Sequence, residues 1–338
     1  MGVRSSIAIA VVCANAAWGQ SANPPRVFQL SNGNATDVRE VANVVQSILA
    51  PDVDADNQGK SITVQTGPPD FALGQWLVET LDKQFQGDSL EVDRYSGTTR
   101  NGAGVAVFRL PRKEPIQTYS EMVNAARTIP EMTDVFPLGN MKAIVARAAP
   151  EKLEMAEWFL RRLEAGGPGS ASAEAKFPAP VNPYALKEHP ELVPDHLEAR
   201  VLYTRERLPV ATFQEIVNAV RTIPELTKVF PVTGKGAVAL TGGPDRVPLA
   251  EWIFQQLDQP NPALGSPTHQ GVSGDTAQIF FMSLSVTEDN FRNAVNRMRT
   301  TAGITRVFPA LAPRAIVVRG TASQLNQAAE IVRSTAAQ

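Results

Sequence analysis

Histidines and carboxylates are the residue types in this chain that could carry chemistry. His189 and His196 share a segment with three carboxylates, and imidazole and carboxylate groups together can bind a divalent metal ion. The segment is interrupted by Pro190 and Pro194, and its two histidines lack the i, i+4 spacing of a helical metal site. The third histidine, His269, stands apart from them. All three fall in expected linkers, and we expect no metal site and no cofactor.

Catalytic patterns of other kinds are missing from the sequence. It contains no G-x-S-x-G, H-E-x-x-H or phosphate-loop signature. Gly234-Lys235-Gly236 reads as a hairpin turn that is too short to hold a phosphate. The single cysteine, Cys13, excludes a disulfide framework and a multi-cysteine metal site. A carboxylate pair remains open from sequence alone, but the chain is expected not to be an enzyme.

Composition limits the classes of partner. The 338 residues include 32 Lys and Arg against 34 Asp and Glu, for a net charge of -2. That balance lacks the basic footprint of a general nucleic-acid binder. Hydrophobic residues make up 43% of the chain, enough for packed cores, and the length suggests two or more domains.

The first residues read as an export signal. Residues 1–20 combine Arg4, an apolar run of about a dozen residues, and small residues at Ala17 and Gly19. We expect cleavage after Gly19, a mature chain without cysteine, and a periplasmic or secreted location. An uncleaved anchor or a buried first helix is the alternative. No later stretch is apolar for long enough to cross a membrane.

Internal repetition is the strongest pattern in the chain. VNAARTIPEMTDVFP, which begins at Val123, returns as VNAVRTIPELTKVFP from Val217 and as VNRMRTTAGITRVFP from Val295. A more distant copy begins at Ala42. Each copy is preceded by a short apolar run and followed by a second apolar run, so one unit of roughly 60 residues occurs four times.

The local pattern of one unit predicts five elements. A Val- and Phe-rich strand is followed by a helix with one apolar stripe, which Pro130 and Pro224 should end. Thr36-Asp37, Thr118, Thr212 and Thr287 read as helix-start residues. A hairpin of two strands and a last helix complete a β-α-β-β-α order. Two helices on one face of a small sheet form a two-layer α+β module.

The sequence therefore predicts four tandem modules joined by Pro- and Gly-rich linkers. KH-type RNA modules have a loosely similar element order, but the chain has neither their G-x-x-G loop nor their basic face. The expected boundaries are a signal peptide at 1–19, modules at 26–86, 104–165, 198–258 and 276–336, and linkers at 166–197 and 259–275.

Several polar residues recur at one position of the first helix in each module. They are candidate interface residues: Asn43, Asn124, Asn218 and Asn296, and three residues further on Arg127, Arg221 and Arg299. A contact between modules is one interpretation. A bond within the module, a solvated helix face or simple inheritance through duplication is the other, and we favour it.

Aromatic residues also recur. Trp76, Trp158 and Trp252 lie beside the apolar stripe of the last helix, and Ile331 takes their place in the fourth copy. Trp is frequent at binding hot spots, yet this position favours packing in the core. The same reading as repeat core applies to Phe136, Phe230 and Phe308.

The repeated pattern resembles the small N-terminal module of bacterial secretins. In that family the module opens with a V-[FY]-x-L strand and closes with a helix that ends in Leu-Asp. Val27-Phe28-Gln29-Leu30, Leu81-Asp82 and Leu257-Asp258 fit, Leu163-Glu164 is close, and the fourth copy has only Thr335-Ala336. The resemblance covers all four units. Nothing after the fourth could form the long, Gly-rich channel domain of a secretin.

The resemblance implies a non-enzymatic, periplasmic interaction or scaffold protein. Its modules would self-associate or dock onto a cell-envelope assembly of the secretion or pilus type. The alternative is an envelope protein that binds peptidoglycan or another polysaccharide. No nucleic-acid partner and no membrane-spanning segment are expected.

Overall fold

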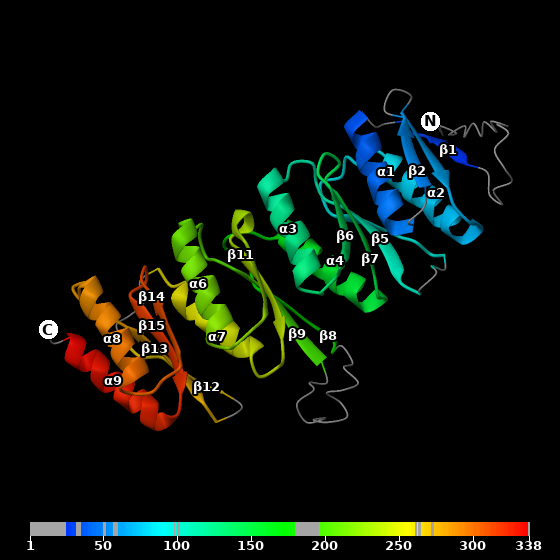
Figure 1. The fold of residues 1–338 in the computed structure, drawn as a ribbon. Helices are drawn as coiled ribbons and strands as arrows, with labels where there is room; N and C mark the ends of the chain where they lie inside the picture. Colours follow the sequence, from blue (N-terminus) through cyan, green and yellow to red (C-terminus); the bar gives the residue numbers. More distant parts are fainter. Residues whose placement is uncertain are drawn as a thin grey trace, which may run out of the picture. The chain divides into compact units, whose positions relative to one another are not determined.

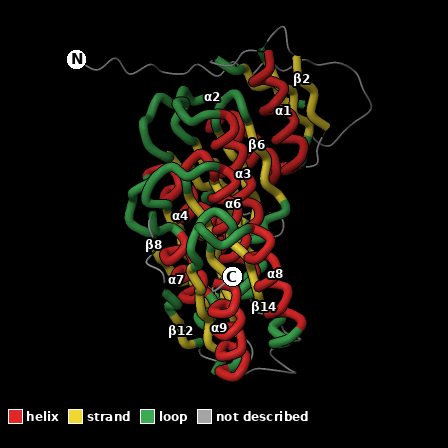
Figure 2. Tube along the Cα trace, turned by 90° about the vertical axis from the view of Figure 1, so that its left-hand side faces the viewer, coloured by secondary structure: helices red, strands yellow, loops and turns green. Residues whose placement is uncertain are grey.

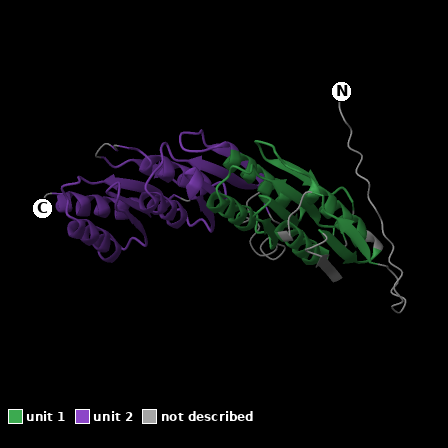
Figure 3. Ribbon diagram, turned by 90° about the horizontal axis from the view of Figure 1, so that it is seen from above, with its two compact units in different colours: residues 1–164 green, residues 165–338 purple. Residues whose placement is uncertain are grey.

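The computed structural model describes residues 25–31, 35–49, 52–56, 60–97, 99, 102–179, 196–260, 262, 265–271 and 274–336. The expected signal peptide, its cleavage point after Gly19, and His189 lie outside these residues. The chain divides into two compact units, Met1–Glu164 and Ala165–Gln338 (Figure 3). The described part is a mixed α+β structure with four small antiparallel sheets (Figure 1).

Each sheet and the two helices that accompany it in sequence are called a group. The first group has the sheet order β1-β3-β2, and the second has β4-β5-β7-β6. The elements of the first are β1 (Arg26–Gln29), α1 (Ala35–Leu49), β2 (Asp52–Asp56), β3 (Ser61–Gln65) and α2 (Pro68–Asp82). Those of the second are β4 (Glu91–Arg94), β5 (Gly104–Arg109), α3 (Ile116–Thr128), β6 (Asp134–Leu138), β7 (Ala143–Ala148) and α4 (Pro150–Ala165).

The second unit repeats this plan. The sheet order is β10-β11-β9-β8 in the third group and β12-β13-β15-β14 in the fourth. The third group contains β8 (Ala173–Pro178), β9 (His196–Tyr203), α6 (Val210–Thr222), β10 (Lys228–Val232), β11 (Ala237–Gly242) and α7 (Val247–Leu257). The fourth contains β12 (Thr268–Gln270), β13 (Thr276–Phe281), α8 (Glu288–Thr300), β14 (Arg306–Ala310), β15 (Ala315–Gly320) and α9 (Ala322–Ala336).

Each sheet has a front face, which its own two helices cover, and a back face on the opposite side. The front of the fourth sheet carries Phe280, Ile316 and Val318, which pack with Phe291 of α8 and Ile331 of α9. The first sheet places Phe28 opposite Ile62, and the second places Phe108 opposite Ile144, in the register that pairs Phe280 with Ile316. Because side chains alternate along a strand, residues one position away lie on the back face.

Segments expected to be linkers contribute strands. The predicted linkers 166–197 and 259–275 contain β8 and β12, and the residues between the first two expected modules, 87–103, contain β4. Each of these strands pairs with the strand that the sequence predicts as the first of its module. β8 alternates between half-buried and exposed residues along its length. This two-residue period was obscured by the Ala- and Pro-rich composition on which the linker prediction rested.

The helix boundaries follow their local sequence with two differences. Thr287 caps α8, since its side chain accepts a hydrogen bond from the backbone N–H of Asn290. Thr118 and Thr212 lie inside their helices instead, because Pro115 and Pro209 take the capping positions of α3 and α6. Two further predictions hold: α3 ends two residues before Pro130, and α6 ends two residues before Pro224.

In each group the hairpin between the two helices turns through a left-handed residue. Lys60, Lys142, Gly236 and Arg314 have φ angles of 53°, 52°, 54° and 49°. Each lies immediately before the last strand of its hairpin. Each accepts a hydrogen bond at its carbonyl oxygen from the residue that follows the strand before the group's first helix, which is β1, β5, β9 or β13. The hairpin and the first strand are therefore joined at this turn in every group.

The edge strands β6, β10 and β14 share a proline. Pro137, Pro231 and Pro309 stand one residue before the end of these strands. A proline has no backbone N–H, so it is tolerated at an edge and not in the middle of a sheet.

In the tube view the helices, in red, run alongside the strands, in yellow (Figure 2). No helix of the described residues has the length and apolar character needed to span a membrane.

Candidate interaction surfaces

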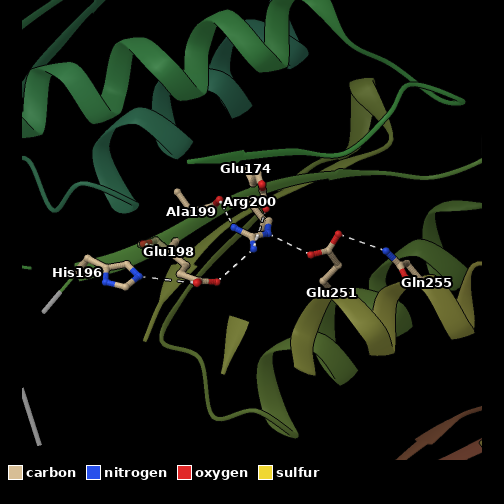
Figure 4. A network of polar contacts seen from close by, with 8 residues as sticks. Glu174, His196, Glu198, Ala199, Arg200, Glu251 and Gln255 are labelled. Atoms are coloured by element: carbon tan, nitrogen blue, oxygen red, sulfur yellow. Dashed lines mark hydrogen bonds and ion pairs between the residues drawn. The ribbon is translucent and has the colours of Figure 1, made fainter. Parts of the chain in front are cut away.

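A polar cluster in the third group surrounds Arg200 (Figure 4). Its guanidinium lies 3.1 Å from Glu174 of β8, 3.2 Å from Glu198 of its own strand and 3.1 Å from Glu251 of α7. The Arg200 side chain is only 11% exposed. A planar guanidinium can serve several carboxylates at once, and here it joins the edge strand, the next strand and the last helix.

This cluster has the composition of a catalytic site but not its geometry. All three carboxylates are engaged by one guanidinium, which leaves no free acid–base pair among them. Nε2 of His196 is 3.8 Å from Glu198, which is too long for a hydrogen bond. No group of three potential ligands suited to a metal ion occurs among the described residues. The arrangement acts as a structural tie.

A hollow of about 360 Å³ in the first unit also contains charged residues. Asp82 on its wall accepts a hydrogen bond from the backbone N–H of Ser31, at 2.9 Å. Arg109 bonds to Asp93 and donates to the carbonyl oxygen of Thr80, at 2.9 Å. These groups are therefore committed to structural bonds, and they do not form a pair poised for acid–base chemistry.

The most regular feature of each unit is the contact between two groups. We call it a seam: the first helix of one group packs on the back face of the next sheet. In the first unit α1 lies against β6, and Val44 and Ile48 belong to one apolar cluster with Val107 and Val145. All four side chains are buried. The second sheet is therefore covered on both faces.

Arginines on the back of the second sheet cap the helices of the first group. Nη1 of Arg147 donates to the carbonyl oxygen of Ile48 in the last turn of α1, at 2.6 Å. Nη2 of Arg109 donates to Thr80 in the last turn of α2. The carbonyls at the C-terminal end of a helix have no partner within the helix and carry partial negative charge, so cations there are stabilising.

A glutamate of α1 holds the turn of the next hairpin. Glu40 accepts hydrogen bonds from the backbone N–H groups of Gly139 and Asn140. Burial raises the pKa of Glu40, the nearby carboxylate of Asp37 raises it further, and the two backbone donors partly offset this. Its Oε2 atom is buried with no hydrogen-bond partner in the described part of the chain.

The second unit has a seam of the same kind. Here α6 packs against β14, and its buried Ala219 and Ile223 cluster with Ile279 and Val317 on the back of the fourth sheet. Glu215 takes the place of Glu40 and accepts a hydrogen bond from the backbone N–H of Ala312 in the hairpin turn, at 2.9 Å. The same glutamate position thus binds the same turn in both units.

The cations of the second seam bind carboxylates instead of helix carbonyls. Arg306 lies 2.9 Å from Glu225, three residues beyond the end of α6, and 3.2 Å from Asp275. Arg319, which corresponds to Arg147, lies 3.6 Å from Asp275. The two seams therefore share their apolar centre and their glutamate but differ in their ion pairs.

Aromatic rings extend both seams. Trp76 of α2 meets Tyr95, which follows β4, with ring centroids 5.4 Å apart. Trp252 of α7 meets His269 of β12 at 5.3 Å. Burial lowers the pKa of His269, so the ring tends to stay neutral beside the indole. In both units the tryptophan joins the last helix of one group to a segment that lies between two expected modules.

The recurring arginines bind within their own groups. Arg127, Arg221 and Arg299 donate to the carbonyl oxygens of Val135, Val229 and Val307, at 2.9, 3.0 and 3.2 Å. Each bond ties the first helix to the hairpin strand that follows it. Asn43, Asn124 and Asn296 are exposed, and Asn218 is half-buried and accepts a hydrogen bond from Gln214. An interface role for these residues stays a prediction.

The residues predicted as repeat core divide into two sets. Ile331 is buried, whereas Trp76, Trp158 and Trp252 are half-buried. The half-buried Phe136 and Phe308 pack against the cluster at the seam, on the back face of their sheets. Phe230 is also half-buried. His196 and His269 were expected in linkers, but they lie in β9 and β12, because the linker segments contribute strands.

The seam residues Glu40, Glu215, Arg109, Arg147 and Arg306 were not singled out from the sequence. One signal was available, since Glu40 and Glu215 occupy the same position, three residues before Asn43 and Asn218. The sequence around these two glutamates does not reveal that each binds a turn in the following group.

Comparisons with known proteins gave matches only among solved structures. No family model matches the chain, and the search of curated proteins found no match. The crystal structure of the N-terminal domain of the secretin XcpQ from Pseudomonas aeruginosa is 16% identical over 42% of this chain and 63% of that chain, with a TM-score of 0.19. The chain therefore spans less than two thirds of that structure.

Two further structures are similar at the same level. A structure of XcpQN012 is 12% identical over 72% of this chain and 98% of that chain, with a TM-score of 0.22. The ETEC pilotin–secretin AspS-GspD complex is 11% identical over 91% of this chain and 54% of that chain, with a TM-score of 0.16.

Proposed function

We propose that this chain is an exported, non-enzymatic interaction protein. It consists of four tandem β-α-β-β-α modules that dock onto a protein assembly of the cell envelope. The signal-like first residues and the secretin-type sequence pattern support the compartment. The Leu-Asp ending of that pattern has a physical role in two groups, because Asp82 and Asp258 accept hydrogen bonds from the backbone N–H groups of Ser31 and Arg205.

The observation that carries the proposal is the position of the exposed apolar side chains. Ile116, Val210 and Leu284 are 60%, 66% and 79% exposed. Ile116 and Val210 begin the first helix of the second and third groups, and Leu284 lies four residues before the first helix of the fourth. Single exposed apolar residues are ordinary, but one near the start of the first helix in three consecutive groups is a repeated feature of the surface. Such a surface suits a protein partner with several contact points.

Site-specific crosslinking tests the proposal. A photoreactive amino acid replaces Ile116, Val210 or Leu284 in the full chain, which is expressed with its own first residues in a Gram-negative host. We expect a mature chain that begins at Gln20 and ultraviolet-dependent crosslinks from these positions to one envelope protein. Arg333, exposed on α9, is the control position and should give no such product. A cytoplasmic chain that retains Met1 would contradict the proposal.

A substitution series distinguishes contact from location. The variant Ile116→Ser, Val210→Ser, Leu284→Ser should lose the envelope partner and keep its fold and its compartment. The matched control is Lys113→Ser, Arg207→Ser, Asp289→Ser, which changes exposed polar residues in the same three places. Recovery of the chain with purified sacculi, independent of the apolar side chains, would favour the polysaccharide alternative.

A further inference from the structure

Two faces of the described groups differ in chemistry from the faces that form the seams. The faces compared are the back of the first sheet and the side of α8 that corresponds to the seam side of α1 and α6. If either carried seam chemistry, a second copy of the chain could pack on it, and the protein would grow end to end.

The seam side of a first helix is marked by its glutamate. Because residues four apart lie on one face of a helix, Glu215 defines a row that continues through Ala219 and Ile223. The corresponding row of α1 is Glu40, Val44 and Ile48. Both rows present one carboxylate and two buried apolar side chains to the next sheet.

The same row of α8 has lost every one of these features. The repeat aligns Asn296 with Asn218, so Asn293, Arg297 and Thr301 stand where α6 has Glu215, Ala219 and Ile223. All three side chains are exposed. Asn293 and Arg297 line a shallow hollow on this side together with Asn290 and Thr300. Covering Arg297 with an apolar sheet would bury a charge without a carboxylate, which is strongly unfavourable.

The back of the first sheet has changed in the same direction. In the second sheet this face presents Ala143 and Val145, and in the fourth it presents Ala315 and Val317, all fully buried. The register places Ser61 and Thr63 at these positions in the first sheet. Gln29, which is exposed, stands where the fourth sheet has the buried Phe281.

We infer that these are two capping faces, which keep the chain a monomer by denying a second copy the seam that joins its own groups. Polar faces of this kind limit the stacking of repeat units. The inference does not depend on the proposed function, and it removes stacking through the seam as a route to self-association.

Sedimentation velocity over a hundredfold range of concentration tests the inference. We expect the mature wild-type chain to sediment as a single chain throughout. The helix variant Asn293→Glu, Arg297→Ala, Thr301→Ile copies the row of α6 onto α8. The sheet variant Gln29→Phe, Ser61→Ala, Thr63→Val copies the fourth sheet onto the first.

Mixing the two variants gives the decisive result. A 1:1 mixture should double in mass, because one copy supplies the helix row and the other supplies the sheet face. A single chain with all six changes should form open, concentration-dependent chains. The control Arg292→Ala, Arg333→Ile alters comparable residues away from the row and should change nothing.

Two outcomes would overturn the inference. One is a wild-type oligomer that Arg297→Glu or Thr63→Arg dissolves, since these faces would then already be in contact. The other is a mixture that stays monomeric while circular dichroism shows both variants folded, since the capping residues would then not be what prevents stacking.

Discussion

The side chain of Arg147 and the backbone carbonyl of Ile48 meet at 2.6 Å, although 99 residues separate them. The arginine lies on the back of one sheet, and the carbonyl ends the helix of the preceding group. Arg147 also binds Asp134 at 2.6 Å, and this ion pair fixes the position of the guanidinium that contacts the helix. A residue in the second group thereby completes an element of the first.

Arg147→Ala should lower the free energy of unfolding of the first unit by about 1.5–3 kcal/mol, the usual range for a hydrogen bond to a charged group. The side chain is 32% exposed, which favours the lower half of this range. Hydrogen exchange of the full chain should show faster exchange in α1 and unchanged protection in the second unit. Asp134→Asn is the control, because it removes the ion pair and leaves the arginine able to cap the helix. Unchanged exchange in α1 would show that the cap contributes nothing.

Glu40→Gln should raise the stability of the first unit near pH 7 and have less effect in acid. The folded chain raises the pKa of Glu40 above its ordinary value of 4.5, so the folded state holds the proton more tightly than the unfolded state. Stability is then lost as the pH rises from about 4.5 through the folded pKa. Glutamine keeps an acceptor for the hairpin turn and removes the buried charge.

The test is urea unfolding of both chains at pH 7 and pH 4, with Glu79→Gln as a control at an exposed position of α2. A glutamine variant that loses stability at pH 7 but not at pH 4 would show that the charge itself holds the turn.

Ala219→Arg and Arg297→Ala form a reciprocal pair at one repeat position. Ala219 is fully buried in the seam of the second unit, so an arginine there should cost more than about 3 kcal/mol. Arg297 is exposed, and its loss should change the free energy of unfolding by less than about 0.5 kcal/mol. Thermal unfolding of the two variants measures the contrast. Equal effects would mean that the two positions have the same environment.

Asp258→Ala should destabilise the third group by about 1–2 kcal/mol. Its Oδ2 accepts the backbone N–H of Arg205 at 2.7 Å, and the residue is only 7% exposed. Asp82→Ala, at the same position of the first group, removes a bond of 2.9 Å at an exposed site and should cost less. Urea unfolding of each variant gives the comparison. A larger loss in Asp82→Ala would show that burial does not set the strength of this bond.

Much of the fold could be predicted from the sequence because each helix and strand has its own hydrophobic pattern. The stripe of Val38, Val41 and Val45 and the alternation of Ile62 and Val64 predicted α1 and β3 correctly. β8 was missed because it reads as a linker by composition. Its strand character depends on pairing with β9, which only the folded chain supplies.

The candidate surfaces were less predictable. A seam needs two faces that lie far apart in sequence. Nothing in the sequence near Glu40 distinguishes it from a glutamate exposed to solvent. The recurring arginines illustrate the reverse case. Arg127 repeats because its bond to Val135 is internal to each group, so repetition alone does not distinguish an interface residue from a structural one.

The prolines of β6, β10 and β14 affect the tendency of the chain to aggregate before it is fully folded. An unpaired strand edge is a template for cross-β aggregation, and a chain with many small sheets exposes many such edges. Pro137, Pro231 and Pro309 leave each of these three edges without an amide donor at one position. A strand of another partly folded copy cannot form an unbroken row of backbone hydrogen bonds with such an edge. The prolines therefore oppose fibril formation.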